Sequence, residues 1–486
     1  MSVKNLNATM ANAAKWSLLT EIVAKILQPV TNAILARLLI PEAFGLVATI
    51  NMVISFTDIF TDAGFQKYIV QHEFENEKQK KLYVNVAFWS NLIISIALLI
   101  VICCVRDKIA ILTGSPNLGK GIAVAALSLP ITSFSSIQMS IFRRELNFKT
   151  LFIVRIASAL VPFVITIPLA YFLRSYWALV IGTLIGNAVT SVLLTVLSDW
   201  KPEFQYKLSV FKDMFGFCYW ILVEAILIWL TSYIGTFIVG RYLSAYYLGV
   251  YKTSITTVSQ IMSLVTAATT PVIFSATSRL QENTKEMYEL FLKSLRLVSL
   301  LLIPMGIGVF IYRNTITAVM LGNQWGDAVL FIGIYGVSNA FSLILASYWD
   351  SLFNAVGKPQ YSVLTQFLYL LVSMPLLLYS AKNGFSSLVL CTCFLRLAYI
   401  VIELIAVKLL LHIGLWKGFS VVLPSVLASI PMVVFGIWQT HTKSNILFDI
   451  LGIVVCIILY FATCVVIKPI RKDLYGMINT IKAKGN

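Results

Sequence analysis

The sequence predicts an all-α integral membrane protein of about fourteen transmembrane helices, organised as two six-helix lobes followed by two further helices. Apolar runs fill the chain almost from end to end, each close to the roughly 20 residues that a helix needs to cross a bilayer core about 30 Å thick. Hydrophobic residues make up 59% and charged residues 12%, whereas soluble domains carry about 25% charged residues. Within a bilayer the backbone must satisfy its own hydrogen bonds, so each run is expected to be helical.

We expect these helices to follow one another through short loops that alternate between the two sides of the membrane. No polar stretch is long enough to form a soluble domain. The predicted helices, in chain order, are 16–37, 43–63, 82–105, 118–140, 151–173, 176–198, 214–238, 250–274, 294–313, 327–353, 361–380, 384–409, 418–438 and 446–467.

Lysine and arginine are distributed unevenly between the two sets of loops, and this predicts the orientation. Of the 37 basic residues, 24 fall on the side of the two termini and 10 on the other side. Because short loops rich in Lys and Arg stay in the cytoplasm, both termini are predicted to be cytoplasmic. Most of the net charge of +16 then follows from topology, and no nucleic-acid partner is predicted. The other three basic residues, Lys25, Arg155 and Arg396, lie well inside predicted helices and are assigned to neither side.

A short motif occurs twice in the chain. Arg37-Leu-Leu-Ile-Pro-Glu-Ala-Phe-Gly45 joins the first two predicted helices, and Arg241-Tyr-Leu-Ser-Ala-Tyr-Tyr-Leu-Gly249 joins the seventh and eighth, at an offset of 204 residues. A second pair, 175–180 and 384–389, repeats a turn followed by a helix at an offset of 209. Both copies start on the same side, so we expect a parallel repeat about an axis along the membrane normal.

The repeat divides the chain into four predicted parts. Residues 1–198 form an N-terminal six-helix lobe and residues 214–410 a C-terminal six-helix lobe. The linker 199–213 mixes aromatic residues with lysines, which is typical of a segment lying on the membrane surface, here its cytoplasmic face. Residues 411–486 add two extra transmembrane helices and a basic cytoplasmic tail.

Polar and charged residues recur at helical spacing inside several predicted spans. Such residues are expensive in a bilayer and usually face a cavity or a partner. We therefore predict a hydrated cleft lined by these stripes where the two lobes face each other. The stripes comprise Glu21, Lys25, Gln28 and Asn32 in the first helix, Asn51, Ser55, Asp58 and Asp62 in the second, Glu224 and Thr231 in the seventh, and Lys252, Thr256, Ser259, Ser263, Thr266 and Thr270 in the eighth.

Several of these residues also admit a structural interpretation. Glu21 and Lys25 are four residues apart and could neutralise each other. Arg396 and Glu403 lie seven apart on one helix face and could form a structural pair. Arg155 could extend to the cytoplasmic interface, and Ser/Thr stripes also serve as packing contacts between membrane helices.

The motifs of common catalytic chemistry do not occur in the sequence. No phosphate-binding Gly-Lys-Ser/Thr loop is found, which argues against an ATP-driven pump. Neither a nucleophile elbow nor a Cys/His set with metal-ligand spacing occurs. We therefore expect no enzyme activity, no metal site and no cofactor beyond a coupling ion, for which Na⁺ and H⁺ are the candidates.

Three stretches resemble those of a known family. They are Ala36-Arg37-Leu38-Leu39-Ile40-Pro41-Glu42-Ala43-Phe44-Gly45-Leu46, Asp62-Ala63-Gly64-Phe65 and Arg143-Arg144-Glu145-Leu146-Asn147-Phe148. They are similar to signature stretches of the polysaccharide transporter family, the Wzx-type flippases of the MOP (MATE-like) exporter superfamily. The pattern of two lobes plus two helices without an ATP site resembles that superfamily as a whole.

This resemblance implies a flippase that works by alternating access in a bacterial inner membrane. Its substrate would be an undecaprenyl-pyrophosphate-linked oligosaccharide for O-antigen, capsule or exopolysaccharide, with membrane lipids, a polysaccharide polymerase and a chain-length regulator as partners. On the residues of this sequence we assign Lys25, Arg396 and Arg155 as candidates for the diphosphate. Polar side chains would line the cleft (Gln28, Asn32, Asn51, Ser55, Thr256, Ser259 and Ser263), and acidic ones would serve coupling or charge pairing (Glu21, Asp58, Asp62, Glu224 and Glu403).

Three other functions remain open at this point. An ion-coupled multidrug antiporter of the same superfamily would need an acidic lumen for cationic drugs, whereas the first helix carries a lysine beside its glutamate. A lipid II flippase would share the fold. A membrane scaffold that transports nothing would have no need of polar stripes in both lobes, because such stripes are costly in a membrane.

Overall fold

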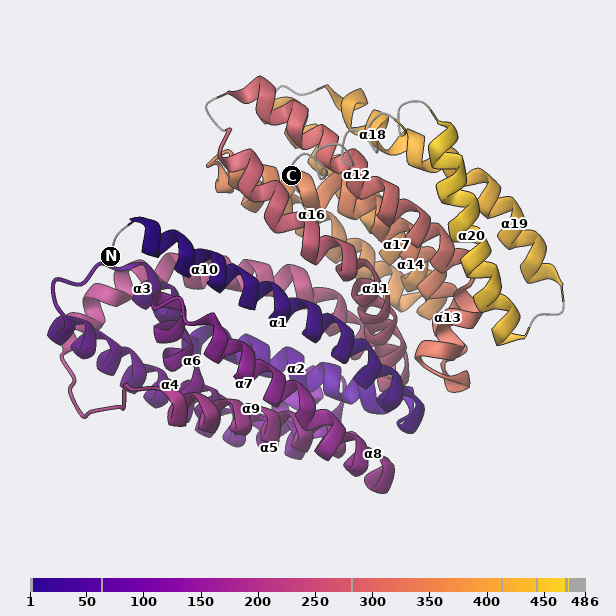
Figure 1. Ribbon diagram of the computed structural model, residues 1–486. Helices are drawn as coiled ribbons and strands as arrows, with labels where there is room; N and C mark the ends of the chain where they lie inside the picture. The colour runs from indigo at the N-terminus through magenta and orange to yellow at the C-terminus, as the bar shows by residue number, and fades with distance from the viewer. Residues whose placement is uncertain are drawn as a thin grey trace. The chain divides into compact units, whose positions relative to one another are not determined.

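The computed structural model describes residues 3–62, 64–280, 283–411, 414–442, 445–467 and 471. Helices account for most of these residues, and no strand occurs among them (Figure 1). Within this part of the chain, thirteen helices are long and apolar enough to cross a membrane, and a bent helix pair brings the number to fourteen. The predicted all-α membrane architecture is confirmed. The basic tail from Lys468 onward lies outside the described residues apart from Arg471.

Contacts between helices divide the chain into two compact units, residues 1–252 (unit 1) and residues 253–486 (unit 2). The division falls inside a continuous helix near the start of the second predicted lobe. This division shows which residues pack together, but it does not test the lobe boundaries that were predicted from the internal repeat. The lobes 1–198 and 214–410, the linker 199–213 and the extension 411–486 therefore stay predictions.

Unit 1 contains the first nine helices, all of the tenth and the start of the eleventh. Helix α10 begins at Leu208, so the last six residues of the predicted linker are helical. A π-helical turn at Pro162–Thr166 joins α7 to α8 within one predicted span. The helices are α1 (Val3–Leu38), α2 (Pro41–Asp62), α3 (Phe65–Gln71), α4 (Glu77–Leu112), α5 (Gly119–Ala126), α6 (Ser128–Arg144), α7 (Phe148–Val161), α8 (Ile167–Leu173), α9 (Trp177–Leu197), α10 (Leu208–Tyr242) and α11 (Ala245–Ser278).

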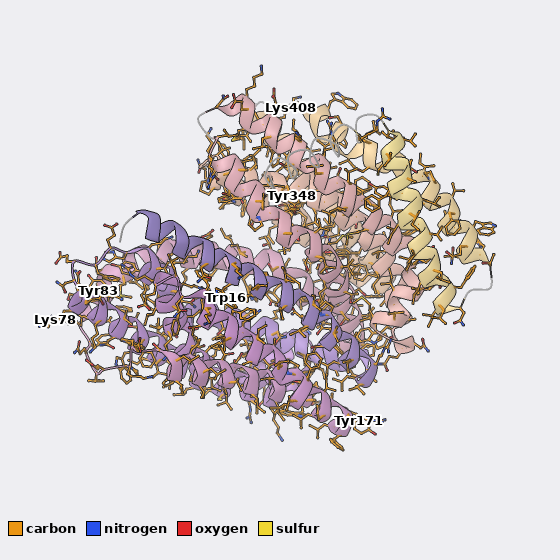
Figure 2. The ribbon with its side chains drawn as sticks, viewed as in Figure 1. Trp16, Lys78, Tyr83, Tyr171, Tyr348 and Lys408 are labelled. Atoms are coloured by element: carbon orange, nitrogen blue, oxygen red, sulfur yellow. The ribbon has the colours of Figure 1, made fainter. Side chains whose placement is uncertain are left out.

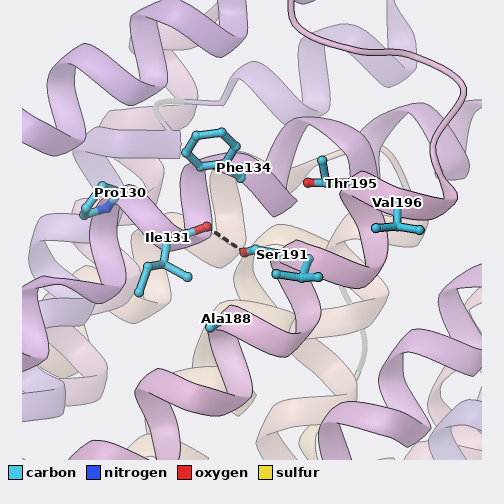
Figure 3. A pocket seen from close by; sticks show the side chains of 8 residues that line it. Pro130, Ile131, Phe134, Ala188, Ser191, Thr195 and Val196 are labelled. Carbon is cyan, nitrogen blue, oxygen red and sulfur yellow. Dashed lines mark hydrogen bonds between the residues drawn. The ribbon is translucent and has the colours of Figure 1, made fainter.

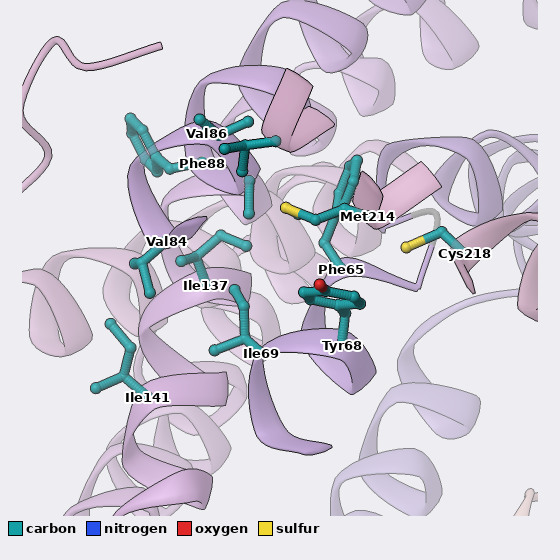
Figure 4. Packing of buried hydrophobic residues seen from close by; sticks show 12 residues of the cluster. Phe65, Tyr68, Ile69, Val84, Val86, Phe88, Ile137, Ile141, Met214 and Cys218 are labelled. Atoms are coloured by element: carbon teal, nitrogen blue, oxygen red, sulfur yellow. The ribbon is translucent and has the colours of Figure 1, made fainter. Parts of the chain in front are cut away.

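The short helix α3 was not predicted from the sequence, and its apolar residues explain why it forms. Gly64 precedes it with a φ of 84°, a left-handed conformation that suits glycine. Phe65 is fully buried in a cluster with Phe88 of α4, Ile137 of α6 and Met214 of α10 (Figure 4). The cluster joins four helices at one end of the unit, so α3 is held by packing rather than by its own length.

Three loops that the charge distribution places on one side of the membrane meet in unit 1. Lys80 lies 3.5 Å from Glu145, and Lys81 forms an ion pair with Glu203 of the linker. Arg144 donates hydrogen bonds to the backbone oxygens of Ile69, at 2.7 Å, and His72, at 2.6 Å. The 64–81, 143–149 and 199–207 segments therefore share one end of the unit.

The opposite ends of unit 1 are visible in Figure 2. Lys78, near the start of α4, and Tyr171, near the end of α8, lie at opposite ends of the helices (Figure 2). This agrees with the predicted alternation of loops.

Unit 2 contains the rest of α11 and nine further helices. The predicted single span 418–438 is two helices, because the chain bends by 47° between α18 and α19. Pro431, in the first turn of α19, cannot continue the hydrogen bonds of α18, which accounts for a break at Ser429. The helices are α12 (Thr284–Ile311), α13 (Arg313–Met320), α14 (Ala328–Ser342), α15 (Tyr348–Ala355), α16 (Pro359–Lys382), α17 (Phe385–Leu411), α18 (Leu415–Ala428), α19 (Ile430–His441) and α20 (Ile446–Val466).

Candidate functional site

The two copies of the repeated motif touch each other in unit 1. A Cβ added to Gly45 of α2 would lie 1.8 Å from the carbonyl oxygen of Ala245, at the start of α11. A Cβ added to Gly249 would lie 1.8 Å from the carbonyl oxygen of Pro41. The offset of 204 relates Pro41 to Ala245 and Gly45 to Gly249, so the two contacts are equivalent by the repeat. Small residues four apart permit such close approach of membrane helices.

A second backbone contact reinforces this crossing. Gly114, which follows α4 with a φ of 80°, has room for no Cβ because the carbonyl oxygen of Gly240 would lie 2.0 Å away. A Cβ on Gly240 would in turn lie 3.1 Å from the carbonyl oxygen of Thr113. The ends of α2, α4, α10 and α11 are thus packed through glycines, and the glycines of the motif serve a structural purpose.

The polar stripe of the second predicted helix lies on α2, where it faces several environments. Ser55 is half-buried, accepts a hydrogen bond of 3.0 Å from the indole of Trp229 on α10 and donates to the Met52 oxygen. Asn51 is exposed and Asp58 is half-buried. The side chain of Asp62 lies outside the described part of the structure. Ser55 therefore joins α2 to α10 through its hydroxyl.

The stripe of the first predicted helix lies on α1. Glu21 and Gln28 are exposed, whereas Lys25 and Asn32 are half-buried. The described side chains include no ion pair between Glu21 and Lys25. The proposed mutual neutralisation of these two residues is therefore not realised in the structure.

Arg155 lies on α7, which packs against α1. Trp16 of α1 and Phe152 of α7 have their ring centroids 5.1 Å apart. Arg155 itself is exposed, so its guanidinium is accessible from outside unit 1.

Glu224 of α10 forms an ion pair with Lys67 of α3. The distance is 3.7 Å, and the two side chains are 53% and 58% exposed. Its two predicted roles, coupling and charge pairing with an intramembrane cation, both stay predictions. An exposed pair of this kind contributes at most about 1 kcal/mol to stability.

Arg396 of α17 is fixed by an aromatic residue in unit 2. Its guanidinium donates a hydrogen bond to the hydroxyl of Tyr335 on α14 and lies 5.2 Å from the centroid of the same ring. Cation–π contact and hydrogen bond together hold the charge in one orientation. Sequence reasoning missed Tyr335, because nothing along the chain relates it to Arg396.

Glu403, two turns further along α17, is fully buried. Neither of its carboxylate oxygens has a hydrogen-bond partner among the described residues, and no ion pair with Arg396 forms there. The alternative reading of these two residues as a structural pair is therefore not met among the described side chains.

The stripe of the eighth predicted helix lies on α11 as expected. Lys252 rests 4.9 Å from the ring centroid of Tyr233 on α10. In the part of α11 that belongs to unit 2, Ser259 is exposed, whereas Thr256 and Ser263 are half-buried. Ser263 donates to the backbone oxygen of Gln260 at 2.8 Å, which is a local helix contact.

An open groove between α6 and α9 does not supply a polar site. It is lined by apolar side chains such as Pro130, Phe134 and Val196 (Figure 3). The hydroxyl of Ser191 in this groove donates its proton to the backbone oxygen of Ile131 at 2.6 Å. Among the described residues, no group of three or more His, Cys, Asp and Glu side chains could hold a metal ion.

The fold is of the MATE-like type. It is similar to the inward closed conformation of the lipid II flippase MurJ, with a TM-score of 0.75 and 14% identity over 93% of this chain and 98% of that chain. It is also similar to an inward-facing multidrug resistance MATE family transporter of the MOP superfamily, with a TM-score of 0.61 and 13% identity over 82% and 94% of the two chains.

The sequence profile of the polysaccharide biosynthesis protein family matches residues 34–330, and the chain belongs to that family. A membrane protein from the cps region of Klebsiella pneumoniae is 25% identical over 382 residues, 77% of each chain. The lipopolysaccharide biosynthesis protein WzxC of Escherichia coli is 22% identical over 67% of this chain and 66% of its own length. The succinoglycan biosynthesis transport protein ExoT of Rhizobium meliloti is 24% identical over 68% and 66%. The resemblance noted in the sequence is confirmed.

Proposed function

We propose that the protein is a flippase for oligosaccharides linked to a polyprenyl pyrophosphate, undecaprenyl pyrophosphate in the first instance. It moves the repeat units of O-antigen, capsule or exopolysaccharide from the cytoplasmic to the outer leaflet by alternating access. The observation that carries this proposal is the family match across residues 34–330. The relatives named for lipopolysaccharide and succinoglycan biosynthesis and the MurJ-like fold support it.

The physical problem is the head group of this substrate. A diphosphate with attached sugars carries about two negative charges, and removing the water around such charges costs many kcal/mol unless other polar groups replace it. Intramembrane cations and hydroxyls can provide that replacement, while the polyprenyl tail remains in the lipid. The task is relocation of an intact molecule, so no catalytic group is required and the protein is proposed not to be an enzyme.

Lys25, Arg396 and Arg155 are the proposed contacts for the diphosphate. Lys25 is supported by its half-buried position and by the absence of an ion pair with Glu21 among the described side chains. Arg396 is supported by its position inside a predicted span and by its orientation against Tyr335. Arg155 is supported by its exposure on α7.

The protein spans its membrane many times, and we propose that this membrane is the bacterial inner membrane with both termini in the cytoplasm. The meeting of the 64–81, 143–149 and 199–207 segments at one end of unit 1 supports their common side. We also propose a polysaccharide polymerase and a chain-length regulator as partners, since these would use the translocated units.

Transport into vesicles tests the proposed function directly. Purified protein is reconstituted into liposomes with a fluorescent polyprenyl-pyrophosphate oligosaccharide in both leaflets, and a membrane-impermeant quencher is added outside. Without flipping, about half of the fluorescence is protected; with an active flippase, nearly all of it becomes accessible.

The same assay separates the two rival transport functions. Equal movement of fluorescent lipid II would assign the protein to the lipid II flippases. Efflux of a cationic dye, with no movement of the oligosaccharide lipid, would assign it to the drug antiporters. Vesicles without protein provide the baseline for each substrate.

A further inference from the structure

The groove between α6 and α9 of unit 1 has the properties of a binding site for a hydrocarbon chain. It has a volume of about 460 Å³, within the range of roughly 300–1,000 Å³ that is usual for small-molecule sites. Phe134 of α6 and Val192 and Val196 of α9 line it and are 37%, 60% and 70% exposed. Both helices belong to candidate membrane spans, so an apolar groove that opens outward here faces lipid.

Two hydrogen bonds join the helices on either side of the groove (Figure 3). Ser191 donates to the backbone oxygen of Ile131 at 2.6 Å, and the side-chain amide of Gln138 donates to the hydroxyl of Thr195 at 3.0 Å. Ala188 lines the groove with a single methyl group and leaves space beside it. The protein therefore shapes this groove by itself, and a ligand does not have to create it.

The length of the groove matches one leaflet of a membrane. Val196 is the second-last residue of α9, and Ala188 lies eight residues before it, which is about 12 Å at 1.5 Å per residue. The hydrocarbon core of a bilayer is about 30 Å thick, so one leaflet accounts for about 15 Å. The groove therefore extends from the end of α9 toward the middle of the membrane.

Aromatic residues mark the end of the groove near Val196 as the membrane surface. The ring of Phe134 contacts Phe88 of α4 at 5.3 Å between centroids, and Phe88 contacts Trp200 of the 199–207 segment at 5.7 Å. Tryptophan is enriched at the interface between membrane and water. The charge distribution places the 199–207 segment on the cytoplasmic side, so the groove belongs to the leaflet on that side.

Lys201 provides a cation at this end of the groove. Its ammonium group donates a hydrogen bond to the backbone oxygen of Thr195, which lines the groove. An ammonium group has three N–H donors, and Lys201 is exposed and forms no ion pair among the described side chains. Of the acidic residues nearby in the sequence, Glu203 is paired with Lys81, and Asp199 is exposed to water.

We propose that this groove binds a phospholipid of the cytoplasmic leaflet, with one acyl chain between α6 and α9 and the phosphate beside Lys201. An apolar groove one leaflet long with a cation at its surface end complements the two parts of such a lipid. A polyprenyl tail as long as that of undecaprenyl would extend well beyond the groove, which favours the shorter acyl chain. The site includes none of the proposed diphosphate contacts and does not depend on the proposed flippase function.

Photo-crosslinking in liposomes tests the site. The protein is reconstituted with phosphatidylglycerol that carries a diazirine along one acyl chain, and peptide mass spectrometry locates the crosslinks after illumination. We expect several-fold more crosslinking at Phe134, Val192 and Val196 than at Ile93 of α4, which is 58% exposed but does not line the groove. Equal crosslinking at Ile93 would show only the contact that any lipid-facing surface makes, and would overturn the site.

Filling the groove should remove the lipid. Ala188→Trp and Val192→Trp should each lower crosslinking at Phe134 several-fold, whereas Ala97→Trp, at an exposed position of α4 outside the groove, should leave it unchanged. Val192 is 60% exposed, so its variant remains informative even if Ala188→Trp fails to fold. Gel filtration confirms the folded state of each variant. Undiminished crosslinking in folded Val192→Trp would refute the proposal.

The head group is tested by removing the cation. Lys201→Ala should lower crosslinking in the groove several-fold, whereas Lys207→Ala, at an exposed lysine of the same segment, should have little effect. Equal losses in the two variants would indicate a general attraction of the basic surface for the lipid. That result would contradict the assignment of the phosphate to Lys201.

Competition identifies the source of the chain. Excess unlabelled phosphatidylglycerol should suppress the crosslinks in the groove more strongly than an equal amount of polyprenyl phosphate. Stronger suppression by polyprenyl phosphate would assign the groove to the tail of the transported lipid and overturn the phospholipid site. A protein that moves no oligosaccharide lipid but shows the expected crosslinks would refute the proposed function and leave the phospholipid site supported.

Discussion

Replacing Gly45 with alanine should destabilise the crossing of α2 and α11. The new methyl carbon would lie 1.8 Å from the Ala245 carbonyl oxygen and 2.8 Å from the Gly249 backbone nitrogen, whereas real Cβ atoms essentially never come closer than 3.0 Å. The obstructing atoms belong to the backbone and cannot rotate away. The helices must therefore separate by more than about 1 Å, or α2 must shift along its axis.

The size of the effect follows from two opposing contributions. Overpacking of a close contact typically costs about 1–3 kcal/mol, occasionally more. Alanine in a helix gains roughly 0.5–1 kcal/mol over glycine. The backbone clash should exceed this gain, so we expect a net loss of about 1–2 kcal/mol and a lower apparent melting temperature in detergent.

Gly308→Ala is the matched control. Gly308 lies inside α12, and a Cβ at this position meets nothing within 4 Å. Only the helix-propensity contribution acts there, so the apparent melting temperature should stay the same or rise. Gly249→Ala should behave like Gly45→Ala, because the repeat places it 1.8 Å from the Pro41 carbonyl oxygen.

The double variant Gly45→Ala, Gly249→Ala adds a test of the geometry. Once the helices have separated for one methyl group, the second is accommodated at little extra cost, so the two effects should be less than additive. Thermal unfolding of the solubilised protein, followed by intrinsic fluorescence, measures all four variants. An apparent melting temperature of Gly45→Ala equal to that of Gly308→Ala would refute the reasoning.

Three further predictions concern charge. Lys25→Ala should impair oligosaccharide export, and Lys25→Arg should retain part of it. The double change Glu21→Ala, Lys25→Ala should not restore export, because no ion pair joins the two residues among the described side chains. Recovery of surface polysaccharide in cells carrying the double variant would argue for a structural pair. Glu224→Gln should cost at most about 1 kcal/mol and leave transport nearly unchanged, since its pairing with Lys67 is exposed. Lost transport with normal stability would instead support the predicted role of Glu224 in coupling. Reporter fusions at the C-terminus and in the 106–120 loop should report the cytoplasm and the opposite side respectively, and the reverse result would overturn the orientation.

The sequence alone determined the architecture of this protein. Hydropathy located the spans because a helix in lipid must be apolar along its whole length, and this constraint acts on each segment separately. The predicted span 82–105 corresponds to α4, which is longer at both ends, and 384–409 corresponds to α17 within two residues at each end. The stretches 36–46, 62–65 and 143–148 likewise indicated the family, which the match over residues 34–330 confirms, and the repeated motif predicted an internal repeat.

Features that depend on how distant segments pack together could be seen only in the tertiary structure. Local sequence could not show that Pro431 bends the predicted 418–438 span into α18 and α19, since prolines such as Pro29 lie inside a single continuous helix. Packing also determines that α3 forms. Its seven residues are helical because Phe65 packs in the core with Phe88 and Met214.

The partners of the charged residues also could not be predicted from the sequence alone. The spacing of charges along the chain allowed pairs of Glu21 with Lys25 and of Arg396 with Glu403 as alternatives, and the structure contains neither among its described residues. Arg396 instead binds Tyr335, and Glu224 binds Lys67, each from another helix. Helical spacing shows which residues share a face, but the partner of a charge is set by the helix packed against that face, and that helix comes from a distant part of the chain.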